Sequence, residues 1–134
     1  MVNPQLYTHE VPDSTDSEVK SLVVQMGGTS GSRNTALTPT SGTKVRIITI
    51  NTHTLDLTTD PEIVYIYFGT GAAYTTNPEK ALVAVRHGAG DGSLQNANWS
   101  VGGGPIGVVD EVVSWLTETE TETGLFLTLH YREE

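Results

Sequence analysis

The chain has 134 residues, a length that fits one domain, and it contains no cysteine, which excludes disulfides, thiol catalysis and cysteine-based zinc sites. Hydrophobic residues make up 37%, glycine and threonine are abundant and helix-favouring residues are sparse, so we expect an all-β protein with many turns. Seven basic residues against 16 acidic ones give a net charge of −9, which argues against binding to nucleic acid or to an anionic membrane surface.

Residues 1–18 are expected to form an extended N-terminal arm. The segment contains two prolines and four acidic side chains but no basic one, and its apolar residues keep neither a strand period nor a helix period. A frayed terminus is the alternative. Leu6, Tyr7 and Val11 are candidate partner contacts, because apolar side chains on an arm need another surface to cover them. The segment also lacks the basic and apolar regions of a signal peptide.

Residues 19–134 are predicted to fold as one antiparallel β-sandwich or jelly roll. Runs rich in β-branched and aromatic residues recur along this region, separated by clusters of glycine, proline and asparagine. The strand-like runs are 19–26, 44–51, 62–69, 80–86, 112–117 and 125–132. We expect about seven or eight strands in all. The rest is predicted to be a surface loop or an irregular edge over 27–42, a turn-rich segment over 93–107 and one helical turn at 107–113.

Two of these runs, 44–51 and 62–69, carry apolar residues on both faces rather than in strict alternation. This pattern predicts central strands with one face on the core and the other covered by a loop, by the arm or by a neighbouring subunit. A small sandwich has only one interior, so a second apolar face favours an oligomer.

No motif in the chain predicts catalysis. Residues 102–107 match the dinucleotide fingerprint G-x-G-x-x-G, but Pro105 lies inside it and strand-like sequence follows, so we interpret it as a tight glycine-rich turn. The four histidines lack metal-ligand spacing, the loop at Asp91 lacks the spacing of a calcium site, and no G-x-S-x-G elbow is present. We therefore predict no enzyme activity, no catalytic residue, no metal ligand and no cofactor.

Three aromatic residues are further candidate partner contacts. Tyr65 and Tyr67 share one face of their strand, where they could stack on a sugar, although such pairs are more often core or interface residues. Trp99 lies among glycine, asparagine and serine, which favours exposure to a ligand or partner.

The stretches 43–51, 64–71, 102–107 and 129–134 carry a resemblance that covers residues 43–134. They resemble small β proteins of tailed-phage structural modules and, in general style, the capsid decoration proteins of phage heads. The resemblance implies a virion protein, assembled in the host cytoplasm, that stabilises the capsid. Its expected partners are the major capsid protein or other virion subunits, and it is expected to act as a homo-oligomer, a trimer.

Two alternatives remain beside the decoration protein. A tail or neck component would share the same architecture, and a carbohydrate-binding module would use Tyr65, Tyr67 or Trp99.

Overall fold

The computed structural model describes residues 18–26, 32–57, 62–71, 78–88, 90–100, 102–118 and 124–134. Over these ranges the chain is all-β apart from one turn of 3-10 helix, η2, at Pro78–Lys80. The strands are β1 (Lys20–Gln25), β2 (Asn34–Leu37), β3 (Val45–Thr54), β4 (Asp56–Leu57), β5 (Glu62–Phe68), β6 (Ala81–His87), β7 (Gly90–Asp91), β8 (Leu94–Asn98), β9 (Val113–Thr117) and β10 (Leu125–Glu133). The predicted arm lies outside the described residues, except for Glu18.

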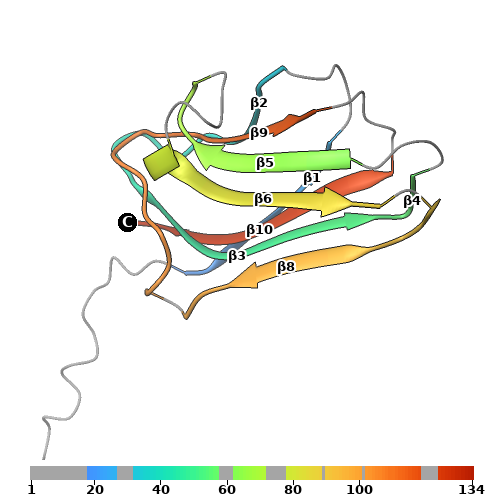
Figure 1. The fold of residues 1–134 in the computed structure, drawn as a ribbon. Coiled ribbons are helices and arrows are strands. Elements are labelled where there is room, and N and C mark those ends of the chain that lie inside the picture. The colour runs from blue at the N-terminus through green and yellow to red at the C-terminus, as the bar shows by residue number, and fades with distance from the viewer. Residues whose placement is uncertain are drawn as a thin grey trace, which may run out of the picture.

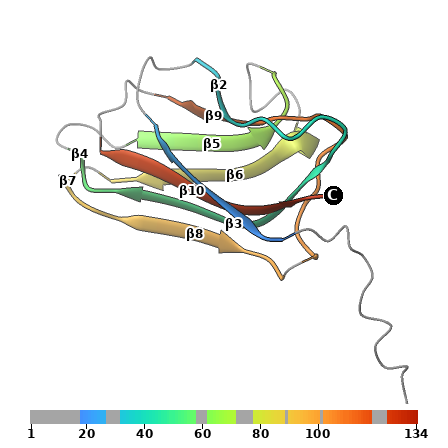
Figure 2. The same cartoon turned by 180° about the vertical axis from the view of Figure 1, so that it is seen from behind.

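The strands form two antiparallel four-stranded sheets, in the orders β1-β10-β3-β8 and β2-β9-β5-β6. The two sheets stack as the layers of a sandwich (Figure 1, Figure 2). The short strands β4 and β7 pair at one end, and the C-terminus lies at the other (Figure 2). The expected all-β sandwich is confirmed.

Buried apolar side chains from both sheets fill the space between them. Along β10 the leucines at alternate positions are fully buried, whereas the residues between them are half-buried. Each fully buried side chain of this size contributes about 1.5–3 kcal/mol. These core side chains include Val45, Ile47, Ile50, Leu125, Leu127 and Leu129 from one sheet and Val64, Ile66, Val113 and Trp115 from the other.

The two apolar runs are central strands, as predicted: β3 lies between β10 and β8, and β5 between β9 and β6. The apolar run in β3 has a different cause from the one expected, however. Tyr131 pairs with Ile47 and His130 with Thr49, so Ile48 is the extra residue of a β-bulge. Ile47 and Ile48 are therefore both buried, and the outward positions after the bulge are polar.

One edge strand, β2, lies where the sequence allowed a surface loop or an irregular edge, and another, β8, lies where it predicted a turn-rich segment, so the prediction for β8 was wrong. β2 lies within 27–42, and β8 lies within 93–107. Both are edge strands, and in β8 every side chain but one is exposed. An edge strand buries little apolar surface, so a polar sequence can pair there without showing an apolar pattern.

The expected helical turn at 107–113 was also wrong. Asp110 adopts a positive φ of 64°, which a helix does not permit. Its carboxylate accepts a hydrogen bond from the Gly42 N–H at 2.6 Å, and its own N–H donates to the Thr43 carbonyl at 2.9 Å. The segment is therefore held against the loop that precedes β3.

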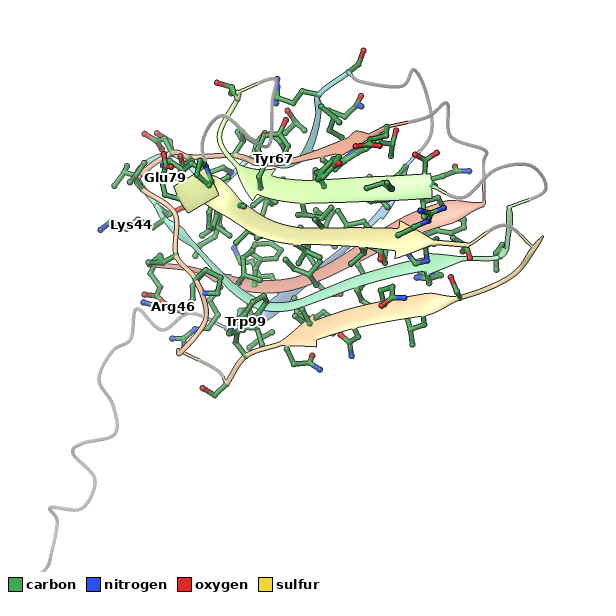
Figure 3. All side chains as sticks on the ribbon, in the orientation of Figure 1. Lys44, Arg46, Tyr67, Glu79 and Trp99 are labelled. Atoms are coloured by element: carbon green, nitrogen blue, oxygen red, sulfur yellow. The ribbon has the colours of Figure 1, made fainter. Side chains whose placement is uncertain are left out.

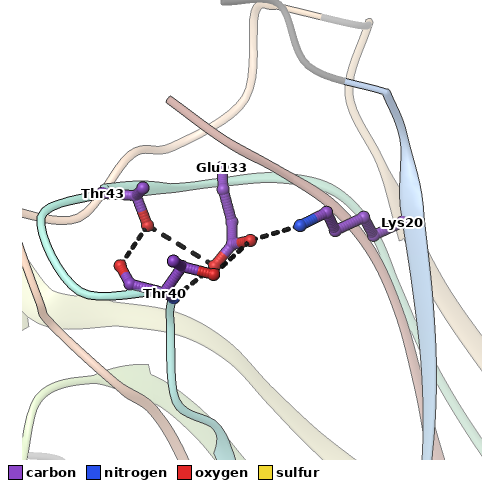
Figure 4. A network of polar contacts seen from close by, with 4 residues as sticks. All are labelled: Lys20, Thr40, Thr43 and Glu133. Carbon is purple, nitrogen blue, oxygen red and sulfur yellow. Dashed lines mark hydrogen bonds and ion pairs between the residues drawn. The ribbon is translucent and has the colours of Figure 1, made fainter.

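Glu133 joins three segments at the C-terminal end of the sandwich (Figure 4). Its carboxylate forms an ion pair with Lys20 at the start of β1. It also accepts hydrogen bonds from the Thr40 N–H at 2.5 Å and the Thr40 hydroxyl at 3.1 Å. The Thr43 hydroxyl lies 3.4 Å from the same carboxylate. The hydrogen bonds from Lys20 and Thr40 lower the pKa of Glu133.

Glu133→Gln is expected to lower the free energy of unfolding at pH 7 by about 1 kcal/mol, because a neutral amide accepts a weaker hydrogen bond from the Thr40 N–H. Since the folded-state pKa of Glu133 is lowered, its contribution is present above the ordinary value of 4.5 and is lost as the pH falls through the folded-state value. The difference between variant and parent should therefore shrink below pH 4.5. Urea unfolding of variant and parent at pH 7 and again below pH 4.5 measures this difference.

Glu79→Gln, on the exposed turn η2, is the control for this variant. It removes the same charge from a solvent-exposed site and should change stability by no more than about 0.5 kcal/mol. Equal effects of the two substitutions would contradict a role for the Glu133 contacts.

Candidate interaction surface

Alternate side chains of β1, β10, β3 and β8 point away from the core and form a regular outer face. Directly paired residues of antiparallel strands share a face, so the registers arrange these side chains in rows across the sheet. The rows are Gln25-Phe126-His53-Leu94, Val23-Thr128-Asn51-Asn96 and Ser21-His130-Thr49-Asn98, with the pair Arg132-Arg46 at the end nearest the C-terminus. We call this set the acid-free face.

The charge of the acid-free face differs from that of the whole chain. The chain carries 16 acidic residues and a net charge of −9, yet none of the positions in these rows is Asp or Glu. Arg46 and Arg132 supply its formal charges. The Arg46 guanidinium donates to both carboxylate oxygens of Glu134, at 2.5 and 3.1 Å, and this contact raises the pKa of Arg46 and lowers that of Glu134. Because the rows themselves carry no carboxylate, a negatively charged partner meets less repulsion along them than on a surface of the chain's average composition.

Amides, hydroxyls and rings occupy the middle of the acid-free face. The Thr49 hydroxyl donates to Asn98 Oδ1 at 3.0 Å, and the His53 ring stacks on Phe126 with centroids 5.3 Å apart and planes inclined by 17°. The Asn51 side-chain oxygen is buried and has no hydrogen-bond partner in the described part of the chain. A buried acceptor without a partner costs about 1–3 kcal/mol, so this oxygen lowers the stability of the sheet.

Exposed apolar side chains flank these polar groups on both edge strands. Val23 on β1 is 62% exposed and Leu94 on β8 is 61% exposed. Val19, which precedes β1, is 50% exposed. A surface that is depleted in charge and that mixes apolar with neutral polar groups has the composition of the centre of a protein interface.

The structure does not bring the three predicted aromatic contacts together. Tyr65 and Tyr67 lie on β5, whereas Trp99 follows β8 in the other sheet; Figure 3 labels Tyr67 and Trp99. Tyr67 is 3% exposed, its hydroxyl donates to the Gly71 carbonyl at 2.7 Å, and burial raises its pKa. Tyr65 is half-buried and donates to the Glu118 carboxylate. Trp99 is also half-buried and packs against the core.

A partner role for these aromatic residues stays a prediction. Leu6, Tyr7 and Val11 lie outside the described residues. The acid-free face was not predicted at all, because its rows combine four strands that are distant in sequence, and one of them, β8, was expected to be a loop.

Sequence reasoning also missed a polar cluster inside the sandwich, around His87. The ring of His87 is 0% exposed, with Nε2 at 2.7 Å from the Thr52 hydroxyl and Nδ1 at 2.7 Å from the Ser93 hydroxyl. A serine hydroxyl on a histidine nitrogen can form a nucleophile, but a substrate cannot reach a ring that is fully buried. The cluster therefore supports the fold.

A cavity of about 400 Å³ is lined by residues 69–71, Lys80 and residues 108–112. Its volume lies in the range of small-molecule pockets. Its charged side chains are engaged with the protein: Lys80 pairs with Glu111 at 2.6 Å, and one oxygen of the Asp110 carboxylate accepts from the Gly42 N–H. The cavity therefore offers a ligand no free cationic group in its described lining.

Over the same described ranges, no group of three or more histidine, aspartate or glutamate side chains is arranged to hold a metal ion, and no helix is long and apolar enough to cross a membrane. A scan against models of protein families finds no match to the chain, and a search of curated proteins finds none either.

Proposed function

We propose that the chain is a non-enzymatic virion structural protein, a capsid decoration protein that binds the outer surface of a phage capsid as a homo-oligomer, a trimer, and stabilises it. The acid-free face carries this proposal. Two acidic proteins repel each other where their carboxylates meet. A chain of net charge −9 can therefore pack against another subunit most readily through rows that contain no Asp or Glu. The resemblance of residues 43–134 to small phage β proteins points the same way.

We further propose that the sandwich is a jelly roll. The sheet orders are β1-β10-β3-β8 and β2-β9-β5-β6, so most neighbouring strands are far apart in the chain. Among these eight strands, β5 and β6 are the one pair that is adjacent both in the chain and in a sheet. This order supports an eight-stranded jelly roll, an architecture that occurs in viral capsid domains and in lectins. In the proposed assembly, residues 1–18 form the arm that crosses a neighbouring subunit.

The purified full chain should cosediment with the DNA-filled heads of the phage that encodes it, at a fixed saturating ratio, and should raise the temperature at which those heads release DNA. Asn96→Asp, which adds a negative charge to the acid-free face, should weaken this binding about fivefold, by like-charge repulsion. Binding to isolated tails or necks and not to heads would support the tail or neck alternative. No binding to any virion part would overturn the proposal.

The composition of the same face favours a carbohydrate-binding module as the second candidate. Amides and hydroxyls next to the stacked rings of His53 and Phe126 are groups that hydrogen-bond and stack on neutral sugars. This candidate requires binding on a glycan array that is lost in Asn51→Ala or Asn96→Ala while the assembly state is unchanged. Loss on Tyr65→Ala or Trp99→Ala would instead place the sugar at the predicted aromatic residues.

A further inference from the structure

We propose that the acid-free face receives residues 1–17 of a neighbouring copy of the same chain. The inference rests on the proposed function in one respect, namely that the chain acts as an oligomer with an N-terminal arm. It adds the surface on which the arm docks.

Charge is the first argument. Residues 1–17 contain Glu10, Asp13 and Asp16 and no lysine or arginine. The rows of the acid-free face contain no Asp or Glu, and Arg46 at their end is paired with the Glu134 carboxylate. An acidic segment on a chain of net charge −9 therefore meets less repulsion along these rows than on a surface of average composition.

The apolar and polar groups also match. Leu6, Tyr7 and Val11 of the arm need apolar surface to cover them, and the face offers Val23 and Leu94 on its two edge strands, both more than half exposed. An extended backbone also supplies N–H donors along its length. These donors suit the exposed amide side chain of Asn96 on β8.

The attachment point and length of the arm permit the contact. Residue 17 lies three positions before β1, the edge strand of the sheet that carries the face. A four-stranded sheet is about 20 Å wide, whereas 17 extended residues span up to about 60 Å. The segment is thus long enough to leave its own sheet and cross that of a neighbour.

The size of the face favours an arm over a second copy docked face to face. Four strands with side-chain rows about 7 Å apart make a patch on the order of 500 Å². A standard stable interface buries about 800 Å² on each partner. An arm adds its own surface to the contact, and in a closed oligomer every subunit both gives and receives one.

The absence of cysteine makes the docking measurable in the full chain. Ser14→Cys places a single thiol on the arm for a nitroxide spin label. Spin-labelled protein of natural isotope abundance is mixed with ¹⁵N-enriched protein that carries no spin label. Only a spin label on another copy can then broaden the observed amide signals. Signals of Asn51, Asn96 and Thr128 should lose more than half of their intensity, while that of Ala84, on the other sheet, should not.

Three results would overturn the inference: no broadening in the mixture, broadening only when the label and ¹⁵N are on the same molecule, or broadening centred on the β2-β9-β5-β6 sheet. If light scattering shows a trimer and the mixture shows no broadening, arm docking is refuted and the proposed function still stands. Arm docking without any binding to phage heads refutes the proposed function and leaves the arm contact standing.

A pair of neighbouring substitutions gives an independent test with matched charge. Asn96→Asp adds a negative charge to the acid-free face, whereas Gln95→Glu adds one to the same strand on its opposite side. The first should raise the dissociation constant of the oligomer about fivefold through repulsion of the acidic arm, and the second should leave it within twofold. Equal effects would overturn the inference, and circular dichroism melting checks that both variants fold.

Discussion

Gly104→Ala is expected to lower the free energy of unfolding by about 3 kcal/mol, at the upper end of the usual cost of overpacking. A Cβ built on Gly104 would lie 1.9 Å from the Ile47 carbonyl oxygen and 3.2 Å from the Trp99 Cβ. The first of these is a backbone atom inside β3 and cannot move aside as a flexible side chain can. Either β3 or the segment that contains Gly104 must shift.

The close approach exists because this segment continues the sheet beyond β8. Ile47 N–H donates to the Pro105 carbonyl at 2.9 Å, Gly107 N–H donates to the Val45 carbonyl at 3.0 Å, and Arg46 and Ile106 form an antiparallel bridge. These bonds satisfy backbone groups at the start of β3 that β8 does not reach. A shift that relieves the clash of the added methyl group would therefore break hydrogen bonds as well as packing.

Gly88→Ala is the control, because an added Cβ at Gly88 has no heavy atom within 4 Å and the residue is exposed. Its effect should stay within about 0.5 kcal/mol. Urea denaturation of both variants with a common slope measures the difference. If the free energy of unfolding of Gly104→Ala is less than 1 kcal/mol below that of the parent, Gly104 does not lie this close to Ile47.

The same segment shows what sequence reasoning could and could not reach. Because Pro105 interrupts the G-x-G-x-x-G pattern, the sequence allowed the dinucleotide interpretation to be rejected. That residues 105–107 pair with the start of β3 depends on tertiary contacts, which no local pattern records. The strands that bury large β-branched residues, β3 and β5 among them, were predictable because burial leaves a compositional trace.

Edge strands and register were not predictable, for physical reasons. β2 and β8 bury little, so their sequences carry no apolar pattern. The bulge at Ile48 reverses which face the next residues take, and this explains why the run 44–51 was expected to be apolar on both faces. The acid-free face follows from the registers of four strands together, so it is visible only once the bulge and both edge strands are known.

Stability is expected to fall as the pH is lowered from 7.5 to 5.5, because of His87. Burial, followed by the nearby charge of His53, lowers the pKa of His87 below its ordinary value of 6.5. The unfolded chain therefore binds a proton at His87 in a pH range where the folded chain does not. Stability from the neutral ring is fully present above pH 6.5 and is lost as the pH falls toward the folded-state value, with a slope of at most about 1.4 kcal/mol per pH unit.

The hydrogen bonds of His87 fit a neutral ring. One ring nitrogen donates and the other accepts, and the hydroxyls of Thr52 and Ser93, each 2.7 Å away, can take either role. A protonated ring would have to donate to both hydroxyls while carrying a charge in the core, which is costly. Glu133 and Glu134, whose pKa values are lowered, lose their contributions only below pH 4.5, so neither carboxylate contributes to a slope between pH 5.5 and 7.5.

His87→Gln should remove most of this pH dependence, because glutamine keeps a donor and an acceptor but does not titrate. Ser93→Ala is the matched control. It removes one hydroxyl contact of the ring and should lower stability by about 1–2 kcal/mol at every pH, yet the slope between pH 5.5 and 7.5 should remain because His87 is still present. Urea unfolding at several pH values separates the two effects. A slope in His87→Gln equal to that of the parent would mean that another group accounts for the loss of stability in acid.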